Sequence, residues 1–150
     1  MKRVFVEEET STGDDTLGIS RAKVVGIIEH ARIFDAREAN NIRDASNATD
    51  DGMISILEDA GTDAVRRELM QLIRDMDVDE QSALVALAWI GRGTYSGREW
   101  SDALTEARQA HNSHTAEYLL GLPLLASYLD TGLADLDAVS AEDAAKRFTP

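Results

Sequence analysis

The sequence DVDEQSALVALAWIGRG, residues Asp77–Gly93, contains the longest unbroken apolar run of the chain and has helix signals at both ends. Asp77 and Glu80 form an Asp-x-x-Glu pair, which is typical of a helix start because the first side chain accepts from the free N–H groups of the first turn. The eight residues Ala83–Ile90 are all apolar, and Ala, Leu and Trp outnumber β-branched residues among them. This composition favours a helix over a buried strand. A helix that is apolar on nearly every face must be surrounded by other helices, so the stretch predicts a buried central helix.

The length and composition of the chain limit the class of protein. At 150 residues it is as long as one ordinary domain and can bury a core without covalent crosslinks. There is no cysteine, which excludes disulfides, thiolate zinc sites and cysteine nucleophiles. The N-terminal sequence lacks the apolar core of a signal peptide, and no segment reaches the roughly 20 apolar residues that span a bilayer. We therefore expect a cytoplasmic protein without a membrane partner.

The formal net charge is −13, and the acidic excess is spread along the chain. Such a charge repels phosphate backbones, so nucleic acid is not an expected partner. A DNA-binding helix-turn-helix would present basic and amide side chains on its second helix, whereas the central helix presents Ala, Leu and Trp. The acidic surface is interpreted mainly as a source of solubility, with a basic protein partner as the alternative.

Before the central helix, the patterns predict three helices and two irregular segments. Residues 1–19 are expected to form an extended arm, and the first helix to start after Ser20, which can cap it. From Asp35 to Thr49 the sequence is polar and rich in asparagine, which predicts a mobile loop centred on Asn40 to Thr49. A short helix should then end at Gly61. The next helix should start at Thr62 and bury an apolar stripe that consists of Val65, Leu69, Leu72, Ile73 and Met76.

After Gly93 the chain again has helical patterns. Ser96 and Glu99 have capping-box spacing, and an amphipathic helix should run from there to near Asn112. A further segment from about Ser113 should break at Pro123, because proline lacks the backbone donor. The apolar face resumes up to Gly132, and a separate short helix is expected after Ser140. Residues 20–150 are thus predicted to form one all-α domain, a small helical bundle around the buried central helix.

Three stretches together show a likeness to a known family: DVDEQSALVALAWIGRG, the pair Glu99–Trp100, and HTAEYLLGLPLLASYLDTGL from His114 to Leu133. With these residues the chain resembles a bacterial family known only as domain of unknown function 3775, matched over about Asp77 to Leu133 with a family-like part of about 62–133. The earlier ARIFDARE and DDGMISILED also look like stretches that precede that domain. The resemblance implies a small helical domain in a bacterial cytoplasm, and it supplies no activity, cofactor or catalytic residue.

His111, His114 and Glu117 form a His-x-x-His-x-x-Glu pattern that would place three possible metal ligands along one helical face. Two imidazoles and a carboxylate suit zinc or iron and would leave positions open for water and hydrolytic chemistry. The predicted helix break at Asn112 and Ser113 opposes this geometry. The alternative is that the two histidines lie at a helix junction as ordinary surface or hydrogen-bonded side chains.

Aromatic residues gather near the central helix and its successor, and they suggest a ligand or interaction pocket. The candidate pocket residues are Arg92, Tyr95, Trp100, His114 and Tyr118. The competing interpretation is that the aromatic side chains form part of the core, as large aromatics usually do.

With no catalytic signature in the sequence, we expect a non-enzymatic module that binds a protein partner or a second copy of itself. Amphipathic helices commonly dock on one another, which is the physical basis of this expectation. No cofactor is expected. The alternative is a small metal-dependent enzyme or ligand-binding protein that uses His111, His114 and Glu117.

Overall fold

Helix α4 (Val78–Arg92) lies at the centre of the computed structural model, which describes residues 17–46 and 52–147. Its residues Ser82–Ala88 and Ile90 are buried, which confirms the predicted central helix. At its start the Asp77 carboxylate accepts from the Glu80 N–H at 2.8 Å, and the Glu80 carboxylate accepts from the Asp77 N–H at 3.0 Å. At its end Gly93 has a φ of 95°, a left-handed conformation that favours glycine. Both predicted helix signals therefore act as caps.

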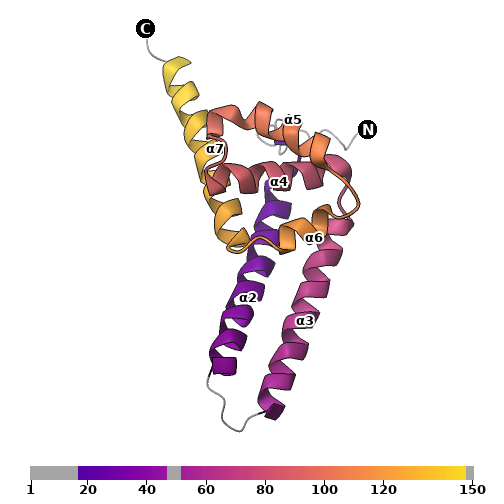
Figure 1. Cartoon of the computed structure of the whole chain (residues 1–150). Coiled ribbons are helices and arrows are strands. Elements are labelled where there is room, and N and C mark those ends of the chain that lie inside the picture. The colour runs from indigo at the N-terminus through magenta and orange to yellow at the C-terminus, as the bar shows by residue number, and fades with distance from the viewer. Residues whose placement is uncertain (1–16, 47–51, 148–150) are drawn as a thin grey trace, which may run out of the picture.

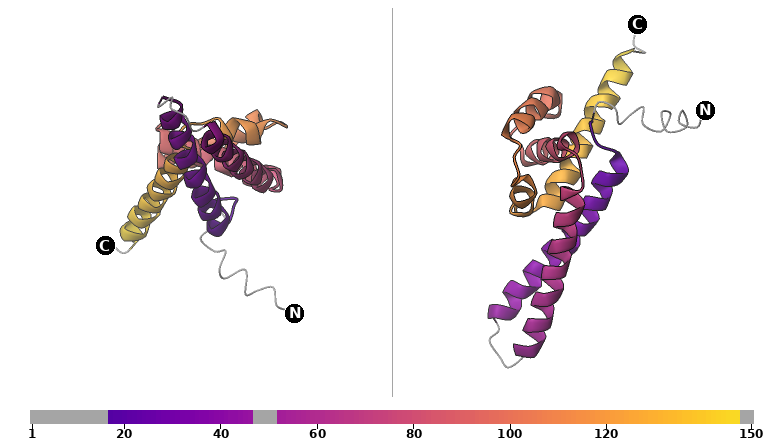
Figure 2. Two further views of the ribbon diagram at one scale, coloured as in Figure 1. Left: turned by 90° about the horizontal axis from the view of Figure 1, so that it is seen from below. Right: turned by 90° about the vertical axis from the view of Figure 1, so that its right-hand side faces the viewer.

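A long helical hairpin, α2 (Arg21–Ser46) and α3 (Gly52–Arg74), precedes α4. The two helices lie side by side, and their outer halves extend beyond the layer of α4, α5 and α6 (Figure 1). Ser20 caps α2 as predicted, since its hydroxyl accepts from the Lys23 N–H at 3.2 Å. Figure 2 shows the hairpin at one end of the molecule and the second half of α7 (Leu125–Arg147) at the other.

Two predictions about this hairpin are wrong. Residues 35–46 of the predicted loop are helical, because neighbouring α3 supports a stretch that contains good helix formers such as Ala36 and Glu38. The rest of that loop, residues 47–49, lies outside the described residues. Gly61 does not end a helix, and α3 passes through it. A Cβ at Gly61 would lie 2.6 Å from Arg37 Nη1, so the missing side chain makes room for the Arg37 guanidinium on the neighbouring helix.

The chain then forms η1 (Gly97–Glu99), α5 (Trp100–Ala110) and α6 (Thr115–Leu120) before α7. The Ser96 and Glu99 capping box is present, and Glu99 accepts from the Ser96 N–H at 2.8 Å. The break between α5 and α6 falls at His111–His114 as expected, and Pro123 lies in the turn between α6 and α7. The predicted separate helix after Ser140 is wrong, because α7 continues without a break from Leu125 through Gly132 to Arg147.

Helix α7 crosses α4 at two glycines, and this explains why Gly132 is not a helix end. A Cβ at Gly132 would lie 2.4 Å from the Leu87 carbonyl oxygen, and one at Gly91 would lie 1.8 Å from the Tyr128 carbonyl oxygen. The two backbones can approach this closely only where neither helix has a side chain. Gly132, which was predicted to end a helix, thus serves as a contact point between two helices.

Within the described residues every regular element is helical, which confirms the all-α prediction. No helix in residues 17–46 or 52–147 is long and apolar enough to cross a membrane. Leu17 and Ile19, which belong to the arm predicted for residues 1–19, are buried in the core. The remainder of that arm, residues 1–16, lies outside the described residues.

Candidate functional site

A pocket of about 200 Å³ lies between α4, the end of α5 and the start of α6. We call it the aromatic pocket; the residues that matter for its chemistry are Val85, Trp89, Ala107, His111, His114 and Tyr118. The Trp89 indole N–H donates to the Tyr118 hydroxyl at 2.8 Å. Tyr95 stacks on Trp89, with ring centroids 6.0 Å apart. The pocket therefore has a fixed aromatic wall and a small apolar floor.

The tautomer of His111 is set by Gln81 on α4. The Gln81 side-chain amide nitrogen donates to two backbone carbonyls, those of Ile73 at 2.8 Å and Met76 at 3.2 Å. Its oxygen consequently faces His111 Nε2 at 2.7 Å and must be the acceptor of that contact. His111 Nε2 therefore carries the hydrogen, and in the neutral ring Nδ1 is a hydrogen-bond acceptor. This network also ties the α3–α4 turn to the end of α5.

The three residues predicted as metal ligands do not form one coordination set. His111 binds Gln81, while Glu117 Oε2 binds Arg74 Nη2 at 2.6 Å and lies 3.9 Å from His114 Nδ1. The N–H of Glu117 itself, followed by the Arg74 guanidinium, lowers the pKa of the Glu117 carboxyl below its ordinary value. Among the described residues, no group of three or more His, Asp and Glu side chains is arranged to hold a metal ion. The metal-dependent function has no geometric support and stays a prediction.

The five residues predicted to form one pocket lie in different places. His114 and Tyr118 line the aromatic pocket, and Tyr95 reaches it only through Trp89. Arg92 is exposed, and its Nε donates to the Thr94 hydroxyl at 3.0 Å. Trp100 lines a separate cleft. The core interpretation holds in part, since Trp89, Tyr95 and Trp100 pack against the core while Tyr118 is exposed.

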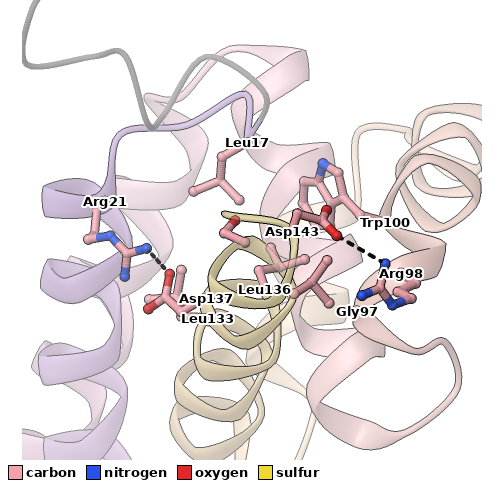
Figure 3. Close-up of a pocket in the computed structure, with 11 residues that line it drawn as sticks. Leu17, Arg21, Gly97, Arg98, Trp100, Leu133, Leu136, Asp137 and Asp143 are labelled. Carbon is pink, nitrogen blue, oxygen red and sulfur yellow. Dashed lines mark hydrogen bonds and ion pairs between the residues drawn. The ribbon is translucent and has the colours of Figure 1, made fainter. Parts of the chain in front are cut away.

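The cleft that contains Trp100 lies between the start of α2, η1 and the second half of α7 (Figure 3). We call it the α7 cleft; it has a volume of about 320 Å³, and its main lining residues are Leu17, Arg21, Arg98, Trp100, Leu136 and Asp137. Arg21 forms an ion pair with Asp137 at 2.5 Å, and Arg98 pairs with Glu142 at 2.5 Å and Asp143 at 3.5 Å. These pairs join the projecting part of α7 to α2 and η1.

A third hollow, of about 300 Å³, lies between α2 and α3. We call it the hairpin groove, and it is lined by Lys23, Gly26, Ile27, His30, Leu72, Asp75 and Met76. A Cβ at Gly26 would meet no atom within 4 Å, so the glycine leaves open space in the groove. Leu72 was predicted to be buried, but it is 37% exposed here.

The sequence patterns gave no indication of the hairpin groove or the α7 cleft as sites. The groove depends on an isolated glycine in α2, and the cleft joins residues that are more than a hundred positions apart. One local pattern bears on the cleft: Leu129, Leu133 and Leu136 follow helical spacing across Gly132. This spacing fits the continuous α7 of the structure, whereas the glycine led to the prediction of a helix end.

The fold and these sites define an all-α protein with an acidic helical body and a projecting hairpin. The family model of DUF3775, a protein of unknown function, matches residues 66–138. The match runs from the second half of α3 to the middle of α7 and confirms the resemblance noted in the sequence. No curated protein and no solved structure matches the chain.

Proposed function

We propose that this protein is a self-association module that forms a dimer through the α2–α3 hairpin. The observation that carries the proposal is the distribution of charge. Helix α2 has five basic and four acidic residues, and α3 has three basic and four acidic residues, so the two helices together have no net charge. The whole charge of −13 therefore belongs to the rest of the chain. These two helices can therefore approach a second copy with less repulsion than the acidic remainder of the chain would meet.

The exposed surface of the hairpin supports the same proposal. Val25, Ile33 and Leu72 are 41%, 49% and 37% exposed, although all three are large apolar residues. Leu72 lies in the hairpin groove beside the open position at Gly26. Apolar side chains and a groove of this kind are what a second helical hairpin would cover in a four-helix arrangement.

The rim of the hairpin groove favours a second copy over an unrelated partner. It contains a cation, Lys23, which pairs with Glu80 at 2.5 Å, and an anion, Asp75, which accepts from Gln71 at 2.7 Å. In a two-fold symmetric dimer the same surface meets itself, so a rim with both signs of charge is complementary to its own copy. The family resemblance further leads us to propose a bacterial cytoplasmic location.

The first prediction is that filling the groove weakens dimer formation. Gly26→Leu places a side chain in open space and improves the helix propensity of α2, so the monomer should remain folded. Leu72→Glu puts a charge on the same surface. Each variant should raise the dimer dissociation constant at least about tenfold, measured by sedimentation equilibrium, which corresponds to about 1.4 kcal/mol.

The matched control is Val78→Glu, which changes another exposed apolar residue, 53% exposed, at the start of α4 and outside the groove. It should leave the dissociation constant unchanged. A wild-type protein that stays monomeric at the highest concentrations would contradict the proposal. So would a dimer that all three variants form equally well.

A further inference from the structure

The aromatic pocket between α4, α5 and α6 is large enough for a single ring. Val85, Ala107 and Thr115 line it and are buried, whereas Ala110 and His114 line it and are exposed at its mouth. In another protein, an apolar cavity of about 150 Å³ binds benzene. At about 200 Å³, the aromatic pocket therefore has room for one six-membered ring with a small substituent.

One wall of the pocket holds a hydrogen-bond donor in a fixed position. The Trp89 indole N–H donates to the Tyr118 hydroxyl at 2.8 Å, and Tyr95 stacks on the same indole. An indole N–H can only donate, so the Tyr118 oxygen is the acceptor in this bond and its own hydrogen is left over. Within residues 17–46 and 52–147, that hydrogen has no acceptor. The Tyr118 hydroxyl is thus anchored by Trp89 and still able to donate.

His111 supplies an acceptor. Since Gln81 fixes the hydrogen on Nε2, the neutral ring keeps Nδ1 as an acceptor, and Nδ1 bonds to no other described residue. The backbone of the same turn is already paired. The Thr115 hydroxyl donates to the Asn112 carbonyl at 3.0 Å and accepts from the Asn112 N–H at 3.1 Å. The Tyr118 hydroxyl and His111 Nδ1 therefore remain as a donor and an acceptor beside the apolar floor.

We propose that the aromatic pocket binds a small neutral aromatic molecule with a hydroxyl group, of about the size of phenol, with its ring against Trp89 and its hydroxyl bonded to Tyr118 and His111. A phenolic hydroxyl both donates and accepts, so one group satisfies both protein atoms. Among the described residues, no Asp, Glu, Lys or Arg side chain lines the pocket, which favours a neutral ligand. The site is separate from the hairpin groove and does not depend on dimer formation.

An NMR titration of the full chain with phenol tests the proposal. The chain has two tryptophans, and Trp100 lies in the α7 cleft, so its indole N–H signal is an internal control for that of Trp89. Trp89→Phe assigns the two signals. Phenol should shift the Trp89 signal saturably with a Kd below about 1 mM, as expected for an efficient small ligand, and leave the Trp100 signal unchanged. Toluene, in which a methyl group replaces the hydroxyl, should bind at least about tenfold more weakly because it pairs with neither polar group.

Two substitutions separate binding in the pocket from a general change in structure. Tyr118→Phe keeps the ring and removes the O–H, so it should weaken phenol binding about fivefold and leave toluene binding unchanged. Ala110→Leu narrows the mouth and should weaken the binding of both molecules. The matched control is Tyr128→Phe, on a partly buried tyrosine of α7 outside the pocket, which should change neither.

Three results would each overturn the proposal. The first is a Trp89 signal that does not shift saturably with phenol. The second is toluene that binds as tightly as phenol, since the donor and acceptor would then play no part. The third is an unchanged affinity for phenol in the Tyr118→Phe protein.

Discussion

At the scale of single residues, Asp35 stands out because its environment opposes its charge. It lies on α2 in a hollow that also contains Phe34, Glu38 and Glu117. Burial, and secondarily the negative charge of Glu38, raise the pKa of the Asp35 carboxyl above its ordinary value of 3.8. The folded protein therefore binds this proton more tightly than the unfolded chain does. It follows that ionised Asp35 destabilises the fold.

The residue-scale prediction is that Asp35→Asn increases the free energy of unfolding at neutral pH, by less than about 1 kcal/mol because solvent screens this partly exposed group. The increase in the free energy of unfolding depends on pH. It should be complete above the raised pKa of Asp35 and shrink as the pH falls through that pKa. It should vanish below 3.8, where Asp35 is protonated in both the folded and the unfolded state. Urea unfolding across this pH range measures the difference.

Glu106→Gln, on an exposed position of α5, serves as the control and should show no such pH-dependent gain. Glu38→Gln should reproduce part of the Asp35→Asn effect, because it removes the second cause of the raised pKa. A less stable Asp35→Asn protein at neutral pH would mean that the carboxylate has a stabilising partner, contrary to this account.

Leu124 is the second residue whose local state is unusual. Its φ is 64°, a left-handed value that is rare outside glycine, and its side chain is 57% exposed. It follows Pro123 in the turn from α6 to α7. Helix α6 ends at Leu120, before Pro123, and Leu124 takes the left-handed conformation from which α7 starts at Leu125 in a new direction. The break between α6 and α7 was predicted from Pro123. Nothing in the sequence indicated which residue next to the proline would have a strained backbone.

At the scale of helices, the close crossing of α4 and α7 fixes the centre of the molecule. Gly91 and Gly132 each face a backbone carbonyl of the other helix. Glycine inside a helix normally costs about 1 kcal/mol relative to alanine. The structure offsets this loss by bringing the two helix backbones together, which buries Ala88, Leu129 and Leu133 at the same interface.

The element-scale prediction is that Gly91→Ala and Gly132→Ala destabilise the protein, although alanine is the better helix former. The added Cβ would lie 1.8 Å and 2.4 Å from carbonyl oxygens, so the helices must move apart. For each variant we expect the free energy of unfolding to fall by about 2–3 kcal/mol or more, which is the range for overpacked cores. Thermal and urea unfolding measure this loss.

Gly26→Ala is the matched control, since it also replaces a glycine inside a helix but its Cβ would meet nothing within 4 Å. The free energy of unfolding of this variant should rise by about 0.5–1 kcal/mol, because alanine has a higher helix propensity than glycine. If all three alanine variants were equally stable, steric contact at the crossing would not be the reason for the glycines.

At the scale of the whole molecule, the two hairpin helices differ in net charge from the rest of the chain. The hairpin helices have no net charge, while the remaining residues have seven basic and twenty acidic side chains. Figure 1 shows that the outer halves of α2 and α3 project beyond α4, α5 and α6, whereas the first half of α2 packs against α7. The sequence alone suggested an evenly spread acidic field. The boundaries of α2 and α3 modify this picture only in that the charges of these two helices, each taken over its full length, balance each other.

The whole-molecule prediction concerns salt. Two copies joined at their hairpins still repel each other through their acidic bodies. Raising the ionic strength from about 0.01 M to about 1 M shortens the Debye length from about 30 Å to about 3 Å, so the dimer should become tighter. Sedimentation equilibrium at several salt concentrations measures the dissociation constant. Association with a basic protein instead of a second copy would weaken with salt, and a dimer that weakens in this way would contradict the proposal.

The sequence by itself determined the class of fold and the central helix. The capping pair Asp77 and Glu80, the unbroken apolar run and the stop at Gly93 are local features, and local hydrogen bonds and burial are sufficient to specify a helix there. The break between His111 and His114 and the turn at Pro123 were likewise readable, because they depend on immediate neighbours.

Only the tertiary structure decided the lengths of α2, α3 and α7 and the location of the candidate sites. Gly61 and Gly132 have the same local signal as Gly93, yet a neighbouring helix passes close to each of them, so the chain continues as a helix. Residues that were predicted to share one pocket line two separate hollows, because their positions also depend on neighbouring helices. Which side chains meet depends on how the helices cross, and helix crossing is set by contacts between residues distant in the sequence.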